Sequence, residues 1–178
     1  MPDSPSEPSK GTSEATSDLG TQGAVVRLAT QAGLTIATGE SLTAGLVAAR
    51  IADVPGASAV LRGGVVAYAT DLKATLLGVS AELLAERGAV DPDVAMAMAG
   101  GARERLRADL GVATTGVAGP DPQDEVMPGT VFVAVAWPGG GRVRRLDVDG
   151  DRPAVRDASV REALGLLLET LRELSNIH

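Results

Sequence analysis

The chain has 178 residues, a net charge of −7 and 44% hydrophobic residues, which predicts one globular domain with a substantial core. The acidic balance (pI about 4.7) argues against a nucleic-acid-binding surface, and the absence of cysteine excludes disulfides, thiolate metal sites and a cysteine nucleophile. Since no apolar run reaches the ~18 residues of a membrane span and the start lacks the layout of a signal peptide, we expect a soluble, cytoplasmic protein without membrane contacts.

Three rare residue types, histidine, lysine and tyrosine, restrict the available chemistry. The one histidine, His178, is the last residue, which disfavours a Ser-His-Asp triad and a histidine-based metal site. The two lysines are Lys10, in a stretch with the composition of a disordered tail, and Lys73, which lies five residues after the one tyrosine, Tyr68. A proton acceptor working near neutral pH must therefore be Lys73, Tyr68 or a carboxylate, although a surface lysine and a core tyrosine fit these positions equally well.

The first 33 residues divide into a polar stretch and a helix. Residues 1–20 are rich in serine, proline and acids and contain almost nothing apolar, which predicts a disordered tail. Residues 21–33 carry apolar residues at helical spacing and end at Gly33, a typical helix stop. We therefore expect one folded domain over residues 21–178.

The next stretch, Thr35–Leu46, is the strongest candidate for a binding site. Its first four residues suit a short buried strand, Gly39, Glu40 and Ser41 interrupt the pattern, and residues from Thr43 onward have the spacing of a helix. Ser41 is therefore expected at the carboxyl end of a strand, with the free amides of a helix start behind it. Open α/β sheets bind ligands and anions at such positions. The plainer interpretation is that Ser41 or Thr43 only caps the helix.

Residues 59–110 are predicted to form one strand and three helices. The strand, 59–68, contains the pair Gly63 and Gly64, which indicates a bulge or the close approach of a ligand or another backbone. Each helix is expected to begin at a capping residue: Asp71, Ser80 and Asp91. Close packing on the sheet would explain the two glycines inside the third helix.

A second strand and loop follow. The strand within residues 111–120 repeats the design of the first, and Thr115 and Gly116 near its carboxyl end are expected to face Ser41 across the edge of the sheet. The segment Asp121–Gly129, with prolines near both ends, is predicted to be an ordered loop or lid.

The remainder of the chain is predicted to be a hairpin and a helix. Strands at 130–137 and 142–148 are separated by a glycine-rich turn. Residues 152–174 have leucine and valine on one face of an amphipathic helix. No solenoid or propeller repeat and no second domain is indicated.

Six short motifs lie in register over about residues 22–174: Thr38–Gly45, Gly63–Tyr68, Lys73 with Leu76–Gly78, Gly88–Val90, Thr115–Pro120 and Gly129–Val131. In order and spacing they resemble the CinA carboxyl-terminal domain family, the nicotinamide-nucleotide amidases. Several motifs in register are far more specific than any one of them.

The chain departs from the family's pattern in three places. The first motif usually has Cys and Gly where this chain has Leu42 and Ala44, and the usual glycine-rich stretch after Pro120 is replaced by Asp121–Asp124. The amino-terminal nucleotide-processing domain of the longer CinA proteins is not expected here, because the polar tail takes its place. These departures, including the altered loop as far as Met127, leave open whether the activity is retained.

The resemblance implies a single three-layer α/β/α domain with a mixed sheet. It implies hydrolysis of the carboxamide of nicotinamide mononucleotide to nicotinic acid mononucleotide and ammonia, a step in pyridine nucleotide recycling, and assembly into homo-oligomers. It implies no metal and no organic cofactor. The expected partner is the small-molecule nucleotide, with no nucleic acid and no membrane.

Combined with the residue types, the resemblance implies a serine mechanism. Ser41 would attack the carboxamide carbon, neutral Lys73 would take the serine proton, and Tyr68 would orient or relay it. Lys73 must then be partly buried, because desolvation lowers the pKa of an amine.

The resemblance also implies a set of substrate-binding residues. Backbone amides around Thr43, Ala44 and Gly45 would hold the oxyanion or the phosphate, and Thr115 and Gly116 would line the other wall. Glu40 would either bind ligand or accept hydrogen bonds from backbone amides of the turn, two roles that remain equally open. Gly64 would let the backbone approach the substrate.

Two other functions remain open from the sequence. A domain that keeps the pocket but lacks amidase activity would bind a nucleotide or a partner, and binding without ammonia release would identify it. A different amide hydrolase would act on another small phosphorylated amide, which a substrate panel would reveal. DNA binding, suggested by the family's link to competence, finds no support in an acidic chain with scattered arginines.

Overall fold

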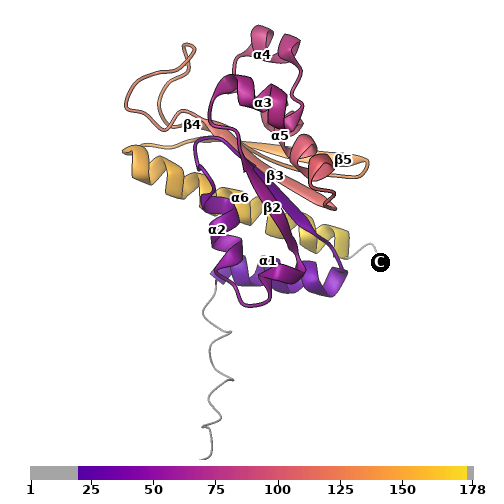
Figure 1. Cartoon of the computed structure of the whole chain (residues 1–178). Coiled ribbons are helices and arrows are strands. Elements are labelled where there is room, and N and C mark those ends of the chain that lie inside the picture. Colours follow the sequence, from indigo (N-terminus) through magenta and orange to yellow (C-terminus); the bar gives the residue numbers. More distant parts are fainter. Residues whose placement is uncertain (1–19, 176–178) are drawn as a thin grey trace, which may run out of the picture.

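Five strands form one mixed sheet between two layers of helices (Figure 1). The computed structural model describes residues 20–175, so the predicted tail lies outside the described residues except for Gly20, which begins the first helix. In chain order the elements are α1 (Gly20–Ala32), β1 (Ile36–Glu40), α2 (Leu46–Ala52), a 3-10 turn (Ala57–Ala59), β2 (Leu61–Val66), α3 (Thr70–Leu77), α4 (Ala81–Arg87), α5 (Pro92–Arg105), β3 (Leu110–Gly116), β4 (Thr130–Trp137), β5 (Gly140–Asp147) and α6 (Arg152–Ser175).

The strand order is β2-β1-β3-β4-β5, with β1 parallel to β2 and β3, and β4 antiparallel to β3 and β5. The parallel strands β1, β2 and β3 therefore end at the same edge of the sheet, where the chain leaves β1 for α2 and β2 for α3. This edge is the expected ligand site of an open α/β sheet.

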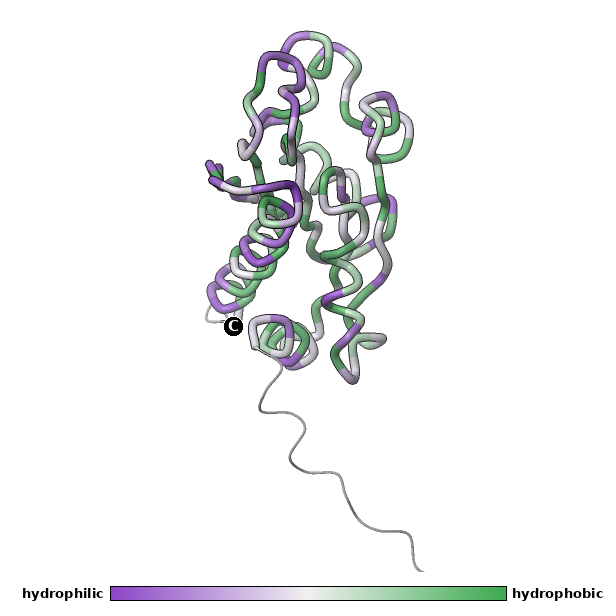
Figure 2. Tube along the Cα trace, turned by 90° about the vertical axis from the view of Figure 1, so that its left-hand side faces the viewer, coloured by the Kyte–Doolittle hydropathy of each residue, from purple (hydrophilic) through white to green (hydrophobic). Residues whose placement is uncertain are grey.

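Alternation along the strands sorts the helices into two layers. Val112 and Val133 point to a core of valine, leucine and isoleucine with α1, α2 and α6, whereas Ala113 and Ala134 point to an alanine-rich core with α3, α4 and α5. The helices show the matching pattern in Figure 2, where the long helix ending near the C mark is purple on its outer side and green toward the sheet. The predicted three-layer α/β/α architecture with a mixed sheet is confirmed.

The ends of several elements differ from the prediction. β1 continues through Gly39 and Glu40, because both residues pair with β2 and β3 instead of breaking the strand. The helix expected from Thr43 begins only at Leu46, because Ala44 has a φ of 51° and the following glycine a φ of 96°, which no right-handed helix accommodates.

The three helices after β2 largely follow their predicted caps. Ser80 accepts a hydrogen bond from the amide of Leu83, and Asp91 accepts one from the amide of Asp93. Asp71, in contrast, lies in the first turn of α3, since that helix already begins at residue 70. The third helix, α5, ends at residue 105, well before the predicted end near residue 110.

The glycine pair in β2 has a structural explanation. The register steps from Ile36 opposite Leu61 to Ala37 opposite Gly63, so one extra residue bulges from β2. A Cβ on Gly64 would come within 2.4 Å of the Thr38 hydroxyl on the neighbouring strand. Packing within the sheet therefore requires this glycine.

Neither of the two glycines inside α5 packs on the sheet as predicted. A Cβ on Gly101 would lie 1.7 Å from the carbonyl oxygen of Leu77, so α5 meets the end of α3 there, whereas a Cβ on Gly100 would meet nothing within 4 Å. The close approach of α5 to the sheet occurs at Gly111 in β3, where a Cβ would lie 1.9 Å from the Ala99 carbonyl oxygen. The small residue needed for this approach is therefore in the strand.

This pair of neighbouring glycines gives a matched stability test. Gly101→Ala should destabilise the fold by about 3 kcal/mol, because the methyl group must displace backbone of α3. Gly100→Ala should stabilise it by about 0.5–1 kcal/mol through helix propensity alone. Urea unfolding of the two variants checks this, and similar free energies of unfolding would contradict the packing described.

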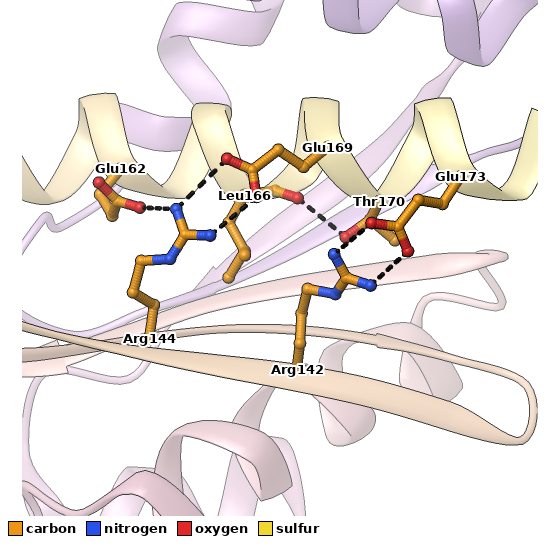
Figure 3. Close-up of polar contacts among 7 residues, drawn as sticks. All are labelled: Arg142, Arg144, Glu162, Leu166, Glu169, Thr170 and Glu173. Carbon is orange, nitrogen blue, oxygen red and sulfur yellow. Dashed lines mark hydrogen bonds and ion pairs between the residues drawn. The ribbon is translucent and has the colours of Figure 1, made fainter.

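Two arginines of the edge strand β5 tie that strand to α6 (Figure 3). Arg144 pairs with Glu162 and Glu169, and Arg142 binds both carboxylate oxygens of Glu173 at 3.0 and 2.6 Å. Bidentate contacts of this kind fix orientation as well as adding stability. They hold α6 in place on the sheet, and the first turns of α6 lie at the edge described next.

Candidate active site

Ser41 and Lys73 meet where the parallel strands end. Ser41 directly follows β1, and Lys73 lies in α3, 32 positions later. Lys73 Nζ lies 3.1 Å from Ser41 Oγ and also donates to the carbonyl oxygen of Ala67 at 3.1 Å. Lys73 is 1% exposed and Ser41 is 8% exposed. The structure thus brings the predicted nucleophile and the predicted base together in a buried position.

The surroundings of Lys73 favour its neutral form. Burial lowers the pKa of Lys73 from 10.5 to about 8, and the Asp71 carboxylate opposes this shift by favouring the charged amine. A neutral amine at hydrogen-bonding distance can accept the hydroxyl proton as the serine oxygen attacks a carbonyl carbon. The pair can therefore perform serine–lysine acyl transfer without histidine.

Glu40 is the cap of α2. Its carboxylate is 1% exposed and accepts five hydrogen bonds of 2.7–3.0 Å, from the Thr38 and Thr43 hydroxyls and the backbone amides of Gly45, Val47 and Ala48. An anion at the start of a helix is favourable, and here the chain itself supplies it. This pattern supports the structural role of Glu40.

The same bonds limit which amides can bind a ligand. The amide of Gly45 donates to Glu40, and the amide of Ala44 donates to the carbonyl oxygen of Ser41 at 3.0 Å. These two hydrogen bonds argue against the expectation that the amides of Ala44 and Gly45 hold the oxyanion or the phosphate. Within residues 20–175, the amides of Leu42 and Thr43 have no hydrogen-bond acceptor, so they are the donors next to Ser41 that remain available for an oxyanion.

Tyr68 lies at the mouth of the site. A cavity of about 320 Å³ is lined by Ser41, Leu42, Tyr68, Gly116 and Arg152 together with the loop between residues 117 and 123. The Tyr68 side chain is 51% exposed, and its hydroxyl contacts the Arg152 guanidinium, with no hydrogen bond to the serine–lysine pair. The structure therefore gives no direct support to proton relay by Tyr68.

The remaining predicted residues are divided between the cavity and the interior. Gly116 lines the cavity, as expected. The Thr115 hydroxyl is buried and donates to the carbonyl oxygen of Ala89 at 2.6 Å, and the Thr43 hydroxyl lies 2.7 Å from that of Thr114. Gly64 packs within the sheet, as described above, and does not line this cavity.

Sequence reasoning missed two arginines at the start of α6. Arg152 lines the cavity, and Arg156 donates to the carbonyl oxygens of Leu42 and Thr43 at 2.9 and 3.2 Å. Arg156 thus binds carbonyl oxygens of the turn that carries Ser41, whereas Glu40 binds a hydroxyl and an amide of that turn. These partners lie 114 and 113 positions away in the chain, so no local pattern reveals them.

Other features of residues 20–175 do not compete with this site. A cavity of about 610 Å³ opens at the opposite end of the sheet, beside Trp137, but its one carboxylate, Asp109, is already bound by Thr35. In the described ranges, no cluster of three or more potential metal ligands occurs. Likewise, no described helix combines the length and apolarity needed to cross a membrane.

Comparison with known proteins places the same region in one family. The model of the CinA C-terminal domain matches residues 19–171. A CinA-like protein of Frankia casuarinae is 49% identical over 155 residues, which cover 87% of this chain and 36% of that protein. A CinA-like protein of Mycolicibacterium gilvum is 50% identical over 142 residues, covering 79% and 34%. The chain therefore spans about a third of the length of these curated relatives.

Solved structures have the same architecture over nearly their whole length. Competence/damage inducible protein CihA from Agrobacterium tumefaciens superimposes with a TM-score of 0.82 at 36% identity, covering 86% of this chain and 94% of that one. A competence-damaged protein (CinA) superfamily protein from Klebsiella pneumoniae gives a TM-score of 0.84 at 31% identity, covering 87% and 98%.

Proposed function

The chain belongs to the CinA C-terminal domain family, and we propose that it hydrolyses the carboxamide of nicotinamide mononucleotide, giving nicotinic acid mononucleotide and ammonia. The observation that carries the proposal is the buried contact of 3.1 Å between Lys73 Nζ and Ser41 Oγ. The substrate comes from the family resemblance of the sequence motifs. The roles of the side chains come from the resemblance and the residue types, and the geometry supports them.

The positions of the serine oxygen, the lysine amine and the free amides suggest the following steps. Ser41 Oγ attacks the carboxamide carbon while its proton passes to Lys73 Nζ, and the resulting oxyanion accepts hydrogen bonds from the amides of Leu42 and Thr43. The carbon–nitrogen bond then breaks, the departing nitrogen takes the proton from Lys73, and ammonia leaves. Water attacks the ester on Ser41, Lys73 takes the water proton and returns it to Ser41 Oγ, and the acid is released.

Ammonia release from nicotinamide mononucleotide tests the proposal. The wild type should turn over, and Ser41→Ala should lose about 1,000-fold or more of that rate, because the bond-forming oxygen is gone. Circular dichroism must show that the variant is folded. Turnover that survives in Ser41→Ala would refute the nucleophile, and absence of turnover in both proteins would favour a domain that only binds.

Two of the family departures lie in the turn after Ser41. Leu42 is 3% exposed and its side chain belongs to the apolar core, and Ala44 occupies the turn at a φ of 51°. Alanine in this left-handed conformation costs about 1–2 kcal/mol, which explains why glycine is usual there. Neither change removes the Ser41–Lys73 pair, which supports the enzyme over the binding-only alternative.

The pH profile should report Lys73. Because the base must be neutral, kcat/KM should rise as pH increases through about 8, the pKa of Lys73. Asp71 raises that pKa, so Asp71→Asn should move the rise to lower pH, whereas Asp71→Glu keeps the charge and should move it little. A profile that is flat through this range, or a shift to higher pH in Asp71→Asn, would contradict Lys73 as the base.

A further inference from the structure

We propose that Arg152 binds the phosphate of the substrate at the mouth of the Ser41 cavity and so selects phosphorylated amides over neutral ones. The inference rests on the proposed function, because it assigns the second end of the same substrate. It also gives Tyr68 a role in positioning Arg152.

The usual place for a phosphate in such a fold is already occupied. The start of the helix after the first strand would normally offer free amides to an anion. Here the Glu40 carboxylate accepts the amides of Gly45, Val47 and Ala48. A second anion beside this buried carboxylate would meet repulsion. The two amides of the turn that remain free among residues 20–175, those of Leu42 and Thr43, lie next to Ser41 and are assigned to the oxyanion. A phosphate therefore needs another partner.

Within residues 20–175, Arg152 has no carboxylate partner. Its guanidinium donates to the carbonyl oxygen of Gly119 at 3.0 Å and to the Tyr68 hydroxyl, both neutral acceptors. Asp121 lines the same cavity but forms no ion pair with Arg152. A guanidinium has five donor hydrogens, so these two contacts leave donors for a phosphate.

Three arginines of β5 differ from Arg152 because each forms an ion pair with a carboxylate. Arg142 and Arg144 bind carboxylates of α6, and Arg145 binds the carboxylate of Asp147. Their charges are balanced within the protein. Arg152, held by Tyr68 and the loop after β3, is the one cation among the residues that line the Ser41 cavity, and a guanidinium is well suited to bind a phosphate.

The cavity connects this cation to the reacting serine. Ser41 is 8% exposed, whereas Tyr68 at the mouth is 51% exposed, and both line the cavity with Arg152. A mononucleotide carries its carboxamide on the ring and its phosphate on the ribose, at opposite ends. With the carboxamide carbon at Ser41 Oγ, the phosphate points toward the mouth. A volume of about 320 Å³ is near the lower limit of small-ligand sites.

The inference is tested by measuring Kd while both residue 152 and the phosphate of the ligand are varied. In the Ser41→Ala background, which prevents turnover, calorimetry measures the Kd of nicotinamide mononucleotide and of nicotinamide riboside, which lacks the phosphate. With Arg152 present, the nucleotide should bind about tenfold or more tightly than the riboside, since hydrogen bonds to charged groups are worth this much. Arg152→Met should remove that difference and leave the riboside Kd unchanged, and Arg152→Lys should restore part of it. Arg161→Met, at an exposed position of the same helix, serves as the control and should change neither Kd.

Each other outcome has a definite meaning. Equal weakening of both ligands by Arg152→Met would show a structural role and overturn the inference. An unchanged nucleotide Kd would also overturn it, while leaving the proposed function in place. If the Ser41→Ala protein binds neither ligand and the wild type releases no ammonia, the proposed function fails and the inference fails with it.

Discussion

Lys73→Met should lose about 1,000-fold or more in the rate of ammonia release from nicotinamide mononucleotide while the protein remains folded. The methylene chain of lysine is replaced by a side chain of similar length, so the packing around α3 is preserved. The variant loses the amine that lies 3.1 Å from Ser41 Oγ, and with it the proton acceptor. A steady-state ammonia assay combined with urea unfolding measures both effects.

The matched variant for this prediction is Lys73→Arg. Arginine keeps the positive charge and the hydrogen-bond donors but remains protonated at every working pH. It should therefore be as inactive as Lys73→Met, which separates proton transfer from charge. The free energy of unfolding of Lys73→Met should be equal to or above that of the wild type, because burial of the amine favours its neutral form and lowers its pKa. Substantial activity in Lys73→Arg would contradict the role of Lys73 as base.

Glu40→Ala should reduce the free energy of unfolding by about 3–5 kcal/mol. The substitution removes the acceptor of three backbone amides at the start of α2 and of two buried hydroxyls. The three amides and the Thr38 hydroxyl lose their partner, whereas the Thr43 hydroxyl keeps its contact with the Thr114 hydroxyl. Glu40→Gln should lie between the two proteins, since it keeps one acceptor oxygen and places an amide group against the donors. Urea unfolding at constant pH and salt measures all three.

Glu86→Ala is the control for Glu40→Ala. Glu86 lies in α4, and its ion pair with Arg87 is largely exposed, with side chains 73% and 48% accessible. Such a pair is worth little, so the change should remain within about 0.5 kcal/mol. A loss below about 1 kcal/mol in Glu40→Ala would mean that α2 does not depend on this carboxylate.

Local patterns in the sequence predicted most elements, and the family resemblance predicted the layers. The strand at residues 130–137 was expected with the bounds that the structure has, because a continuous apolar run lies between Gly129 and the glycine-rich turn that begins at Pro138. The bulge in β2 was also indicated by its paired glycines. The start of α2 was not predictable in this way, since it depends on the backbone conformation of Ala44 and on the carboxylate of Glu40 reaching forward to three amides.

The site was only partly predictable, because local patterns mark single residues but not the contacts between distant segments. Ser41 and Lys73 were singled out by a strand end and by the scarcity of lysine, and the structure places them in contact, although their catalytic role remains a prediction. Tyr68 was expected beside Lys73 because of its position in the chain, yet its hydroxyl contacts Arg152. Arg152 and Arg156 depend on the docking of α6 against segments far away in sequence, which hydropathy patterns do not reveal.

The most direct test of the central claim is the titration of Lys73 itself. The chain has two lysines, Lys10 and Lys73, so a protein labelled with ¹³C at lysine Cε gives two resolvable NMR signals, assigned with Lys10→Arg. The signal that remains in Lys10→Arg belongs to Lys73 and should titrate with a pKa of about 8, below the ordinary lysine value of about 10.4. A Lys73 signal that titrates near 10.4 would contradict a neutral, buried Lys73 as the base that activates Ser41.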